Sequence, residues 1–399
     1  MKYTFPEINH ISDVLPAIEG SPEFIVAERD GYKVINYNVN MPDTFPPINE
    51  SQELEFDILA QRNKLRRECR GIMFCSETGE IIRRPYHKFF NVGERDETQP
   101  HKIGLHERHS ILEKLDGSFI VPFYANDRLI WGTKMGETDV AGPVVKFVNE
   151  NNEYIKLAEH MLADGFNPIF EWCSRKQRIV IDHPEDRLVL TGIRSLVSGE
   201  YFSYDDLFYA GYLYAIPVVK RFDSRTDINS FIEYTRDLQD TEGFVIRFDD
   251  GHMLKLKCDW YCQIHKAKEK LLFDRNIVEM ILEGNIDDLK PHLLHDDKEK
   301  LENFERIVWA RILEKSVYIN DAVMYYQHDR KADRKTFALE HVSNLQPLFR
   351  PIAFRLWDNN TLDNAKMYLI DTIKSNLGSN SKYENIKYTI LNGEKFNEF

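Results

Sequence analysis

The sequence predicts an α+β domain followed by an all-helical domain. Up to about residue 266, short runs of β-branched and aromatic residues alternate with turn signals such as Asn126-Asp127 and Asp250-Gly251. Beyond that point, apolar residues recur at helical spacing almost throughout. We therefore expect a first domain over residues 1–267 and a helical C-terminal domain over residues 268–399, each long enough to bury a core.

Particular segments carry these patterns. Strand-like runs lie at residues 32–37, 128–133, 187–191 and 243–248. In the first domain, helical spacing appears at Val144, Val145, Phe147 and Val148, and again at Ile155, Leu157, Met161 and Leu162. In the second domain it appears at Ile277, Met280 and Ile281, and at Ile307, Val308, Ala310, Ile312 and Leu313.

The clearest local structure is a hairpin around Asp250-Gly251. Because side chains alternate across a strand, Lys255 and Lys257 project to one face of the outgoing strand. Two like charges on one face repel each other unless an anion lies between them. The incoming strand begins with the carboxylate of Glu242, and this combination suits a phosphate with its metal ion. The alternative is a surface strand with an edge lysine.

Composition and charge restrict the class of protein. No apolar run approaches the ~18 residues of a membrane span, and the N-terminus lacks the apolar segment of a secretory signal. The five cysteines are odd in number and too sparse for a disulfide framework. We therefore expect a protein of the reducing cytoplasm with no membrane partner.

The net charge of −13 argues against non-specific coating of nucleic acid, but the basic residues gather in groups. Solvated faces explain most such groups; the alternative is local basic grooves on an acidic body. The groups are Arg62, Lys64, Arg66, Arg67 and Arg70; Arg83, Arg84 and Lys88; Arg175, Lys176 and Arg178; Lys266, Lys268 and Lys270; and Arg330, Lys331, Arg334 and Lys335.

Two further positions are candidates for chemistry. Lys114 stands just before Asp116-Gly117, between two strand-like segments, where it could act as a nucleophile on a nucleotide α-phosphate. The alternative is a hairpin turn with an exposed lysine. Glu171 lies inside an apolar run and needs a partner, either an arginine or a ligand hydroxyl.

Taken together, these motifs resemble those of the covalent nucleotidyltransferases, which include DNA ligases, RNA ligases and capping enzymes. Within that superfamily the chain most resembles the phage-type RNA ligase 1 family, the tRNA-repair ligases of T-even bacteriophages. The resemblance implies a nucleotidyltransferase domain of the ATP-grasp-like ligase type, with antiparallel sheets. The helical sequence after the last lysine motif supports the RNA ligase branch, because DNA ligases and capping enzymes carry an OB-fold there. The resemblance also implies that residues 268–399 are a module for RNA specificity. The matching segments are Tyr37-Asn38, 68–74, 84–91, Lys114-x-Asp116-Gly117, Phe170-Glu171, 242–245, Lys255-x-Lys257, 259–261, 287–290 and 333–336.

The resemblance also implies a role for each matching position. Lys114 would be the nucleophile that carries AMP. The ATP contacts would be Tyr37, Arg70, Lys88, Phe90, Glu171, Glu242, Lys255 and Lys257. Further functional positions are Asp116, Gly117, Thr133, Lys134 and Tyr261, whereas Gly132 stands where the family commonly has a lysine. Asp287 matches a Mg²⁺ position, with Glu242 a second candidate ligand and Mn²⁺ an alternative metal. Asp287 would also suit a helix N-cap, and Tyr261 the core.

The activity implied is ATP-dependent joining of 5′-phosphate and 3′-hydroxyl ends of single-stranded RNA, through a Lys114–AMP and an adenylylated RNA end. A protonated lysine is a poor nucleophile, so Lys255, Lys257 and Mg²⁺ are expected to favour its neutral form. The implied role is RNA or tRNA repair, with nicked tRNA a candidate substrate. The expected protein is a monomer in the cytoplasm, that of the host if a phage encodes it.

Two other functions are compatible with the same residues. One is a DNA ligase or a capping-type enzyme, and labelling by GTP instead of ATP would indicate capping. The other is a non-catalytic protein that binds RNA ends. The presence of every charged residue of the core motifs argues against this second alternative.

Overall fold

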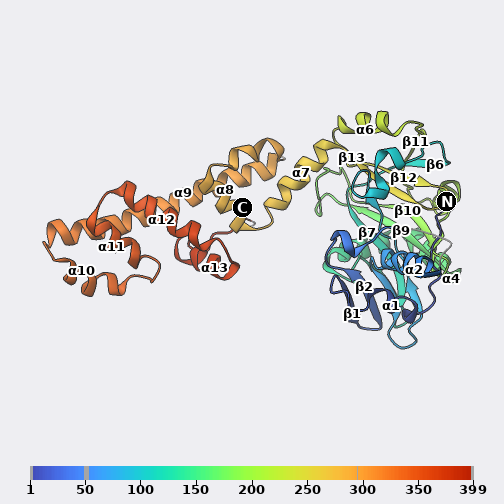
Figure 1. Ribbon diagram of the computed structural model, residues 1–399, viewed down its shortest axis with the longest axis horizontal. Helices are drawn as coiled ribbons and strands as arrows, with labels where there is room; N and C mark the ends of the chain where they lie inside the picture. Colours follow the sequence, from blue (N-terminus) through green and yellow to red (C-terminus); the bar gives the residue numbers. More distant parts are fainter. Residues whose placement is uncertain (1–2, 49–53, 294, 397–399) are drawn as a thin grey trace. The chain divides into compact units, whose positions relative to one another are not determined.

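The computed structural model describes residues 3–48, 54–293 and 295–396, and the chain divides into two units. Unit 1 is Met1–Cys262 and unit 2 is Gln263–Phe399, so the division falls inside helix α7 (Asp259–Lys270). Strands and helices form unit 1, whereas the regular structure described in unit 2 is helical (Figure 1). The predicted α+β class with antiparallel sheets and a C-terminal helical region is confirmed.

The first sheet of unit 1 is antiparallel and near the N-terminus. Its strands are β1 (Phe24–Arg29), β2 (Tyr32–Tyr37), β3 (Ile72–Cys75) and β4 (Ile81–Arg83), and helices α1 (Leu15–Ile18) and α2 (Leu54–Glu68) precede β1 and β3. Ile8, Ile35 and Phe74 are among the buried side chains of its core. Strand β2 coincides with the predicted strand at 32–37.

The second sheet has the order β10-β9-β7-β8. Its strands are β7 (Ser118–Ala125), β8 (Arg128–Gly132), β9 (Phe166–Cys173) and β10 (Arg187–Ser195). Asn126 and Asp127 have φ of 48° and 56°, and these values suit the two-residue turn that joins β7 to β8. Helices α3 (Gly142–Glu150) and α4 (Glu153–Ala163) follow, and they confirm both helices predicted between β8 and β9.

The third sheet has the order β11-β6-β12-β13-β5, in which only β5 and β13 pair in parallel. Its strands are β5 (Phe90–Asn91), β6 (His109–Glu113), β11 (Arg221–Phe222), β12 (Gly243–Phe248) and β13 (Met253–Lys257), and helices α5 (Tyr204–Leu213) and α6 (Ile228–Arg236) lie before β11 and β12 in the chain. Val245 stands opposite Lys255, so the predicted hairpin is confirmed.

Unit 2 contains α8 (Asp274–Glu283), α9 (His295–Met324), α10 (Arg334–Glu340), α11 (Arg350–Asp358), α12 (Leu362–Asn376) and α13 (Asn380–Thr389). One apolar cluster joins them, and it includes Ile277, Phe304, Val308 and Leu369. Gly284 adopts a φ of +75° where α8 ends, a conformation that glycine adopts without strain. Of the helices described in either unit, none is long and apolar enough to cross a lipid bilayer.

Candidate active site

A cavity of about 230 Å³ lies between the second and third sheets of unit 1. Strands β6, β12 and β13 line it from the third sheet, and β7, β9 and β10 line it from the second. The predicted site residues that line it are Arg70, Lys114, Gly117, Glu171 and Lys255. Charged groups set among apolar and aromatic side chains are typical of a small-molecule site.

Lys114 lies on the segment that crosses from one sheet to the other. Strand β6 ends at Glu113 in the third sheet and β7 begins at Ser118 in the second, so residues 114–117 do not close a hairpin. The alternative of a hairpin turn with an exposed lysine is wrong, because the Lys114 side chain is only 20% exposed. Its amide donates to the Gly243 carbonyl at 2.9 Å and thereby extends the pairing with β12.

Glu242 holds two lysines together at this point. Its Oε1 lies 2.8 Å from Lys114 Nζ and 2.9 Å from Lys257 Nζ, and its side chain is 4% exposed. A buried carboxylate is stable where charged donors satisfy it. The carboxylate expected beside the hairpin lysines therefore pairs Lys257 with Lys114. It leaves Lys255 without a counterion among the described residues.

Lys255 and Arg70 are basic groups that no carboxylate contacts within the described part of the chain. Burial, and then the positive charges of Arg70 and three neighbouring lysines, hold the pKa of Lys255 well below its usual range. Lys255 Nζ lies 4.6 Å from the centroid of the Phe89 ring, and the Arg70 guanidinium lies 4.9 Å from that of Phe119. Arg70 also has a buried terminal nitrogen with no hydrogen-bond partner. These groups favour an anionic ligand.

Glu171 projects from β9 and stands opposite Phe119 in the strand register. Removal from water raises the pKa of its carboxyl to about 8. The sequence allows two partners for Glu171, an arginine or a ligand hydroxyl. No arginine among the described residues forms an ion pair with it, so the ligand hydroxyl is the partner that we expect. Gly117 lets the Lys114 segment approach, because a Cβ there would lie 2.4 Å from the Trp172 carbonyl oxygen.

We expect Glu171→Gln to reduce the pH dependence of stability. The unfolded chain ionises this carboxyl near pH 4.5, whereas the folded protein keeps it protonated up to about pH 8. Unfolding between these values releases a proton, so the carboxyl lowers stability progressively as the pH rises through this window. The melting temperature of the wild type should therefore fall relative to that of Glu171→Gln between pH 4.5 and about 8. A constant difference would contradict the raised pKa.

Asp116 fixes the backbone beside Lys114. Its Oδ2 accepts hydrogen bonds from the amides of Val180 and Ile181 at 2.7 and 2.6 Å, and its Oδ1 accepts one from the Tyr261 hydroxyl at 2.7 Å. Asp116 and Tyr261 are each 3% exposed, and neither lines the cavity. The structure brings these two predicted residues together as a support behind the nucleophile candidate.

A second group of predicted residues lies beside the first sheet. Lys134 Nζ and Lys88 Nζ lie 4.7 and 5.1 Å from the centroid of the Tyr37 ring, a cation–π geometry. Burial lowers the pKa of both lysines, that of Lys88 to about 8. Phe90 is 2% exposed and belongs to the core of the first sheet, whereas its neighbour Phe89 lines the cavity.

Thr133 lies in a turn after β8. Its Oγ1 is 3.3 Å from the Gly136 carbonyl oxygen and 3.1 Å from Thr138 Oγ1, and it does not line the cavity. A Cβ at Gly132 would lie 3.0 Å from the Gly136 backbone. A lysine at position 132, which the family commonly has there, would therefore crowd the backbone of this turn.

Asp287 lies in unit 2, in the 3-10 turn Ile286–Asp288, with its carboxylate 2.7 Å from Lys290 Nζ. It caps no helix, so the N-cap alternative is wrong. Among the residues that the structure describes, no three His, Cys, Asp or Glu side chains are grouped as a metal site would need. The assignment of Mg²⁺ to Asp287 and Glu242 stays a prediction.

The side chains that line the cavity outside the predicted set include Tyr86, Phe89, Phe119 and Arg247. Arg247 and Val245 face the cavity from β12, opposite Met253 and Lys255 of β13. The alternation of side chains along a strand, which places Lys255 on one face of β13, therefore also places Arg247 of β12 on the face that lines the cavity. Tyr86 and Phe89 belong to an extended stretch without a periodic pattern, so the sequence gives no such signal for them.

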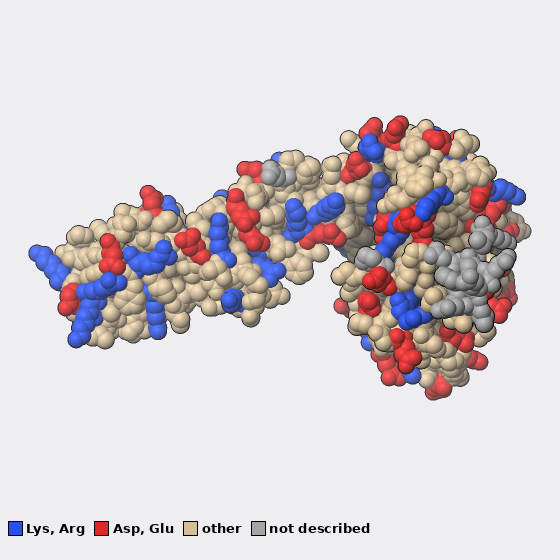
Figure 2. Space-filling view, in the orientation of Figure 1, with Lys and Arg blue, Asp and Glu red and all other residues tan. Residues whose placement is uncertain are grey.

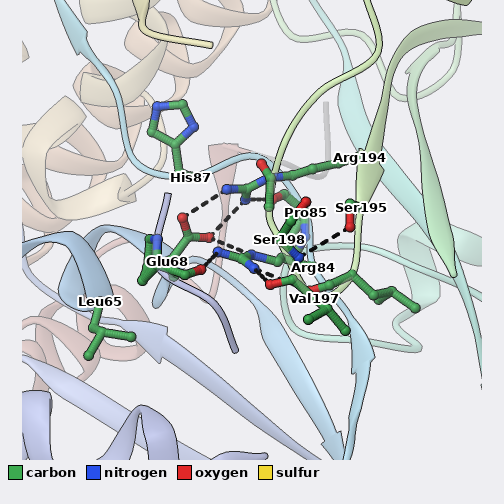
Figure 3. Close-up of polar contacts among 12 residues, drawn as sticks. Leu65, Glu68, Arg84, Pro85, His87, Arg194, Ser195, Val197 and Ser198 are labelled. Atoms are coloured by element: carbon green, nitrogen blue, oxygen red, sulfur yellow. Dashed lines mark hydrogen bonds and ion pairs between the residues drawn. The ribbon is translucent and has the colours of Figure 1, made fainter. Parts of the chain in front are cut away.

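A buried ion cluster positions two segments of the site (Figure 3). The Glu68 carboxylate accepts hydrogen bonds from both terminal nitrogens of Arg194 at 2.8 Å and from Nε of Arg84 at 3.1 Å. The side chains of all three residues are at most 2% exposed. Burial alone would raise the pKa of Glu68, but the guanidinium groups of Arg194 and Arg84 outweigh it and hold this pKa below its usual range. Arg84 begins the stretch that carries Tyr86 and Phe89, and Glu68 stands two residues before Arg70. The cluster therefore fixes both segments.

An α+β fold with a lysine surrounded by basic groups and carboxylates in a small cavity is compatible with the class of covalent nucleotidyltransferases. The family described as RNA ligase matches residues 68–261, the span that carries Arg70, Lys114, Glu171, Glu242 and both hairpin lysines. Over this span, just under half of its length, the chain is similar to the RNA ligase family.

Individual known proteins are similar to this chain. A candidate RNA ligase of Thermovibrio ammonificans is 29% identical over 293 residues, which cover 70% of each chain. RNA ligase 1 of bacteriophage TS2126 is 24% identical over 245 residues, which cover 56% of this chain and 57% of the phage protein. Among solved structures, an archaeal ATP-dependent RNA ligase has 13% identity and a TM-score of 0.45 over 65% of each chain. The match thus spans less than two thirds of the phage relative and of the archaeal structure.

Proposed function

We propose that the protein is an ATP-dependent RNA ligase that joins a 5′-phosphate to a 3′-hydroxyl in broken RNA, such as a nicked tRNA. One observation carries the proposal: the Lys114 amine stands at the 230 Å³ cavity together with Lys255 and Arg70, two basic groups that no described carboxylate contacts. This arrangement lies in the part of the chain that matches the family described as RNA ligase.

In the first step, Lys114 Nζ attacks the α-phosphorus of ATP. A nitrogen–phosphorus bond forms and the bond to pyrophosphate breaks. Lys255 and Arg70 would bind the phosphates, and Glu171 would accept a hydrogen bond from a ribose hydroxyl once it ionises. Glu242 lies 2.8 Å from the Lys114 amine, within reach of the proton that the attacking nitrogen must lose.

In the second step, AMP passes from Lys114 to the RNA 5′-phosphate and forms a phosphoanhydride. In the third step, the RNA 3′-hydroxyl attacks the activated phosphorus, AMP leaves and a phosphodiester bond forms. Each step is an in-line displacement at phosphorus, and such steps are catalysed mainly by positioning and electrostatics. The rigid support of Lys114 by Asp116 and the fixed cations of the cavity suit this kind of catalysis.

A divalent cation fits this site as a companion of the nucleotide. When bound, Mg²⁺ or Mn²⁺ would neutralise phosphate charge and assist the departure of the leaving group. Mg²⁺ is usually held by one or two carboxylates together with substrate phosphates and water, in keeping with the absence of a three-residue metal cluster among the described side chains. Glu242 is the residue proposed to contribute at this cavity, and Asp287 is proposed separately as a Mg²⁺ ligand in unit 2.

Incubation of the full chain with Mg²⁺ and ATP labelled at the α-phosphate tests the proposal. We expect an acid-labile covalent label on the peptide that contains Lys114, and its transfer to single-stranded RNA bearing a 5′-phosphate. Labelling by GTP alone would indicate a capping-type enzyme, and transfer only to DNA ends would indicate a DNA ligase. RNA binding without any label would mean a non-catalytic protein that binds RNA ends.

A further inference from the structure

We propose that a second, basic cavity, in unit 2, binds the phosphate backbone of the RNA strand. The proposal rests on the proposed function and adds a contact for the RNA strand in unit 2. The cavity measures about 600 Å³ and lies between α7 and the turns that follow α8. The polar side chains that line it are Gln263, Lys266, Lys270, Asn285 and His292.

The lysines of this cavity differ from their neighbours in having no counterion in the part of the chain that the structure describes. Lys266 and Lys270 are exposed, line the cavity together and make no ion pair with any described residue. Lys268, between them in sequence, pairs with Asp297 at 3.1 Å, and Lys290 pairs with Asp287 and Glu305 at 2.7 and 2.9 Å. Asp297, Asp287 and Glu305 thus neutralise other lysines, and among the described residues Lys266 and Lys270 keep their positive charges for a ligand.

The spacing of these lysines suits a chain of phosphates. Residues i and i+4 of a helix have Cβ atoms about 5–6 Å apart on one face, so Lys266 and Lys270 present two cations side by side. None of the described residues that line the cavity is acidic. In a chain with a net charge of −13, such a site stands out against the mixture of charges that Figure 2 shows over the visible face of the helices.

The remaining lining residues favour the backbone of the strand over its bases. Met280 and Leu289 supply apolar surface, and the described lining contains one ring, that of His292, and no tryptophan, tyrosine or phenylalanine on which a base could stack. Gln263 and Asn285 offer amide groups that hydrogen-bond phosphate oxygens or ribose 2′-hydroxyls. Contacts of this kind position a strand without reading its sequence. The expected ligand is therefore single-stranded RNA of any sequence.

The test is the salt dependence of RNA binding by the full chain. Fluorescence anisotropy would follow binding of a 5′-phosphorylated single-stranded RNA, once as oligo(U) and once as a mixed sequence, over a range of salt concentrations. Each phosphate contact in a single strand contributes about 0.7 to the slope of log K against log salt, so Lys266→Ala/Lys270→Ala should reduce the magnitude of the slope by about 1.4 for both RNAs. Lys266→Arg/Lys270→Arg retains both charges and should keep the wild-type slope.

Lys298→Ala/Lys300→Ala is the matched control. These lysines are exposed in the same unit, do not line the cavity, and their removal changes the net charge equally. An equal loss of slope in this control, an unchanged slope in Lys266→Ala/Lys270→Ala, or an effect on one RNA sequence only would overturn the proposal. Wild-type labelling by ATP, measured on the same preparation, tests the proposed function separately. Normal labelling with an unchanged slope would reject the backbone site alone.

Discussion

Lys114→Ala is expected to lower covalent labelling by α-labelled ATP at least about 10³-fold, since loss of a catalytic nucleophile commonly costs more than this. Lys114→Arg should fail equally, because a guanidinium stays protonated and offers no free electron pair. Glu242 would still pair with Lys257 at 2.9 Å, so the buried carboxylate keeps a counterion in both variants. We therefore expect the fold to persist, which circular dichroism would check.

The same variants separate nucleophilic chemistry from the rest of the reaction. Joining of an RNA whose 5′ end already carries AMP needs no lysine adduct, so Lys114→Ala is expected to retain this step. Lys146→Ala removes an exposed lysine on α3, outside the cavity, and should label like the wild type. Wild-type labelling of Lys114→Ala would exclude this lysine as the nucleophile.

Glu68→Gln is expected to lower the free energy of unfolding by about 3–5 kcal/mol, the usual cost of removing one partner from a buried ion pair. The change leaves the guanidinium groups of Arg84 and Arg194 buried without a negative charge, although their hydrogen bonds to backbone carbonyls remain. Urea unfolding of the full chain, followed by tryptophan fluorescence, would measure the loss. Trp131 and Trp172 are buried in unit 1 and report on it.

An exposed ion pair of the same unit provides the comparison. Arg108 Nε lies 3.1 Å from Asp249 Oδ2, and the two side chains are 92% and 56% exposed. Because water already screens such a pair, Asp249→Asn should cost far less than Glu68→Gln. Equal losses in the two variants would show that the buried cluster does not stabilise unit 1 in the way its geometry suggests.

The parts of the site that the sequence predicts are those determined by local pattern. Asp250-Gly251 and the alternation of lysines and leucines after it define the β12–β13 hairpin and one face for Lys255 and Lys257. The helices α3 and α4 follow from helical spacing in the same way. In each case the residues that determine the structure are neighbours in the chain, so a short stretch of sequence is enough to predict the element.

Other parts depend on contacts between distant segments. No local pattern indicates that Glu242 joins Lys257 to Lys114, because three strands must first assemble into a sheet. Phe89 and Phe90 are adjacent and equally apolar, yet one lines the cavity and the other lies in the core of the first sheet. Strand β5 comprises only Phe90–Asn91, too short for alternation to reveal which side chain faces the cavity.

The hydrogen bonds of Asp116 have a mechanical consequence for the nucleophile. Its carboxylate binds the amides of residues 180 and 181 and the hydroxyl of Tyr261, which stands in the first turn of α7. The backbone two residues after Lys114 cannot shift without breaking contacts with both of these segments. The backbone at Lys114 is therefore held in place. Rotations about the four methylene groups of its side chain, and not a movement of the loop, must bring Nζ to the α-phosphorus.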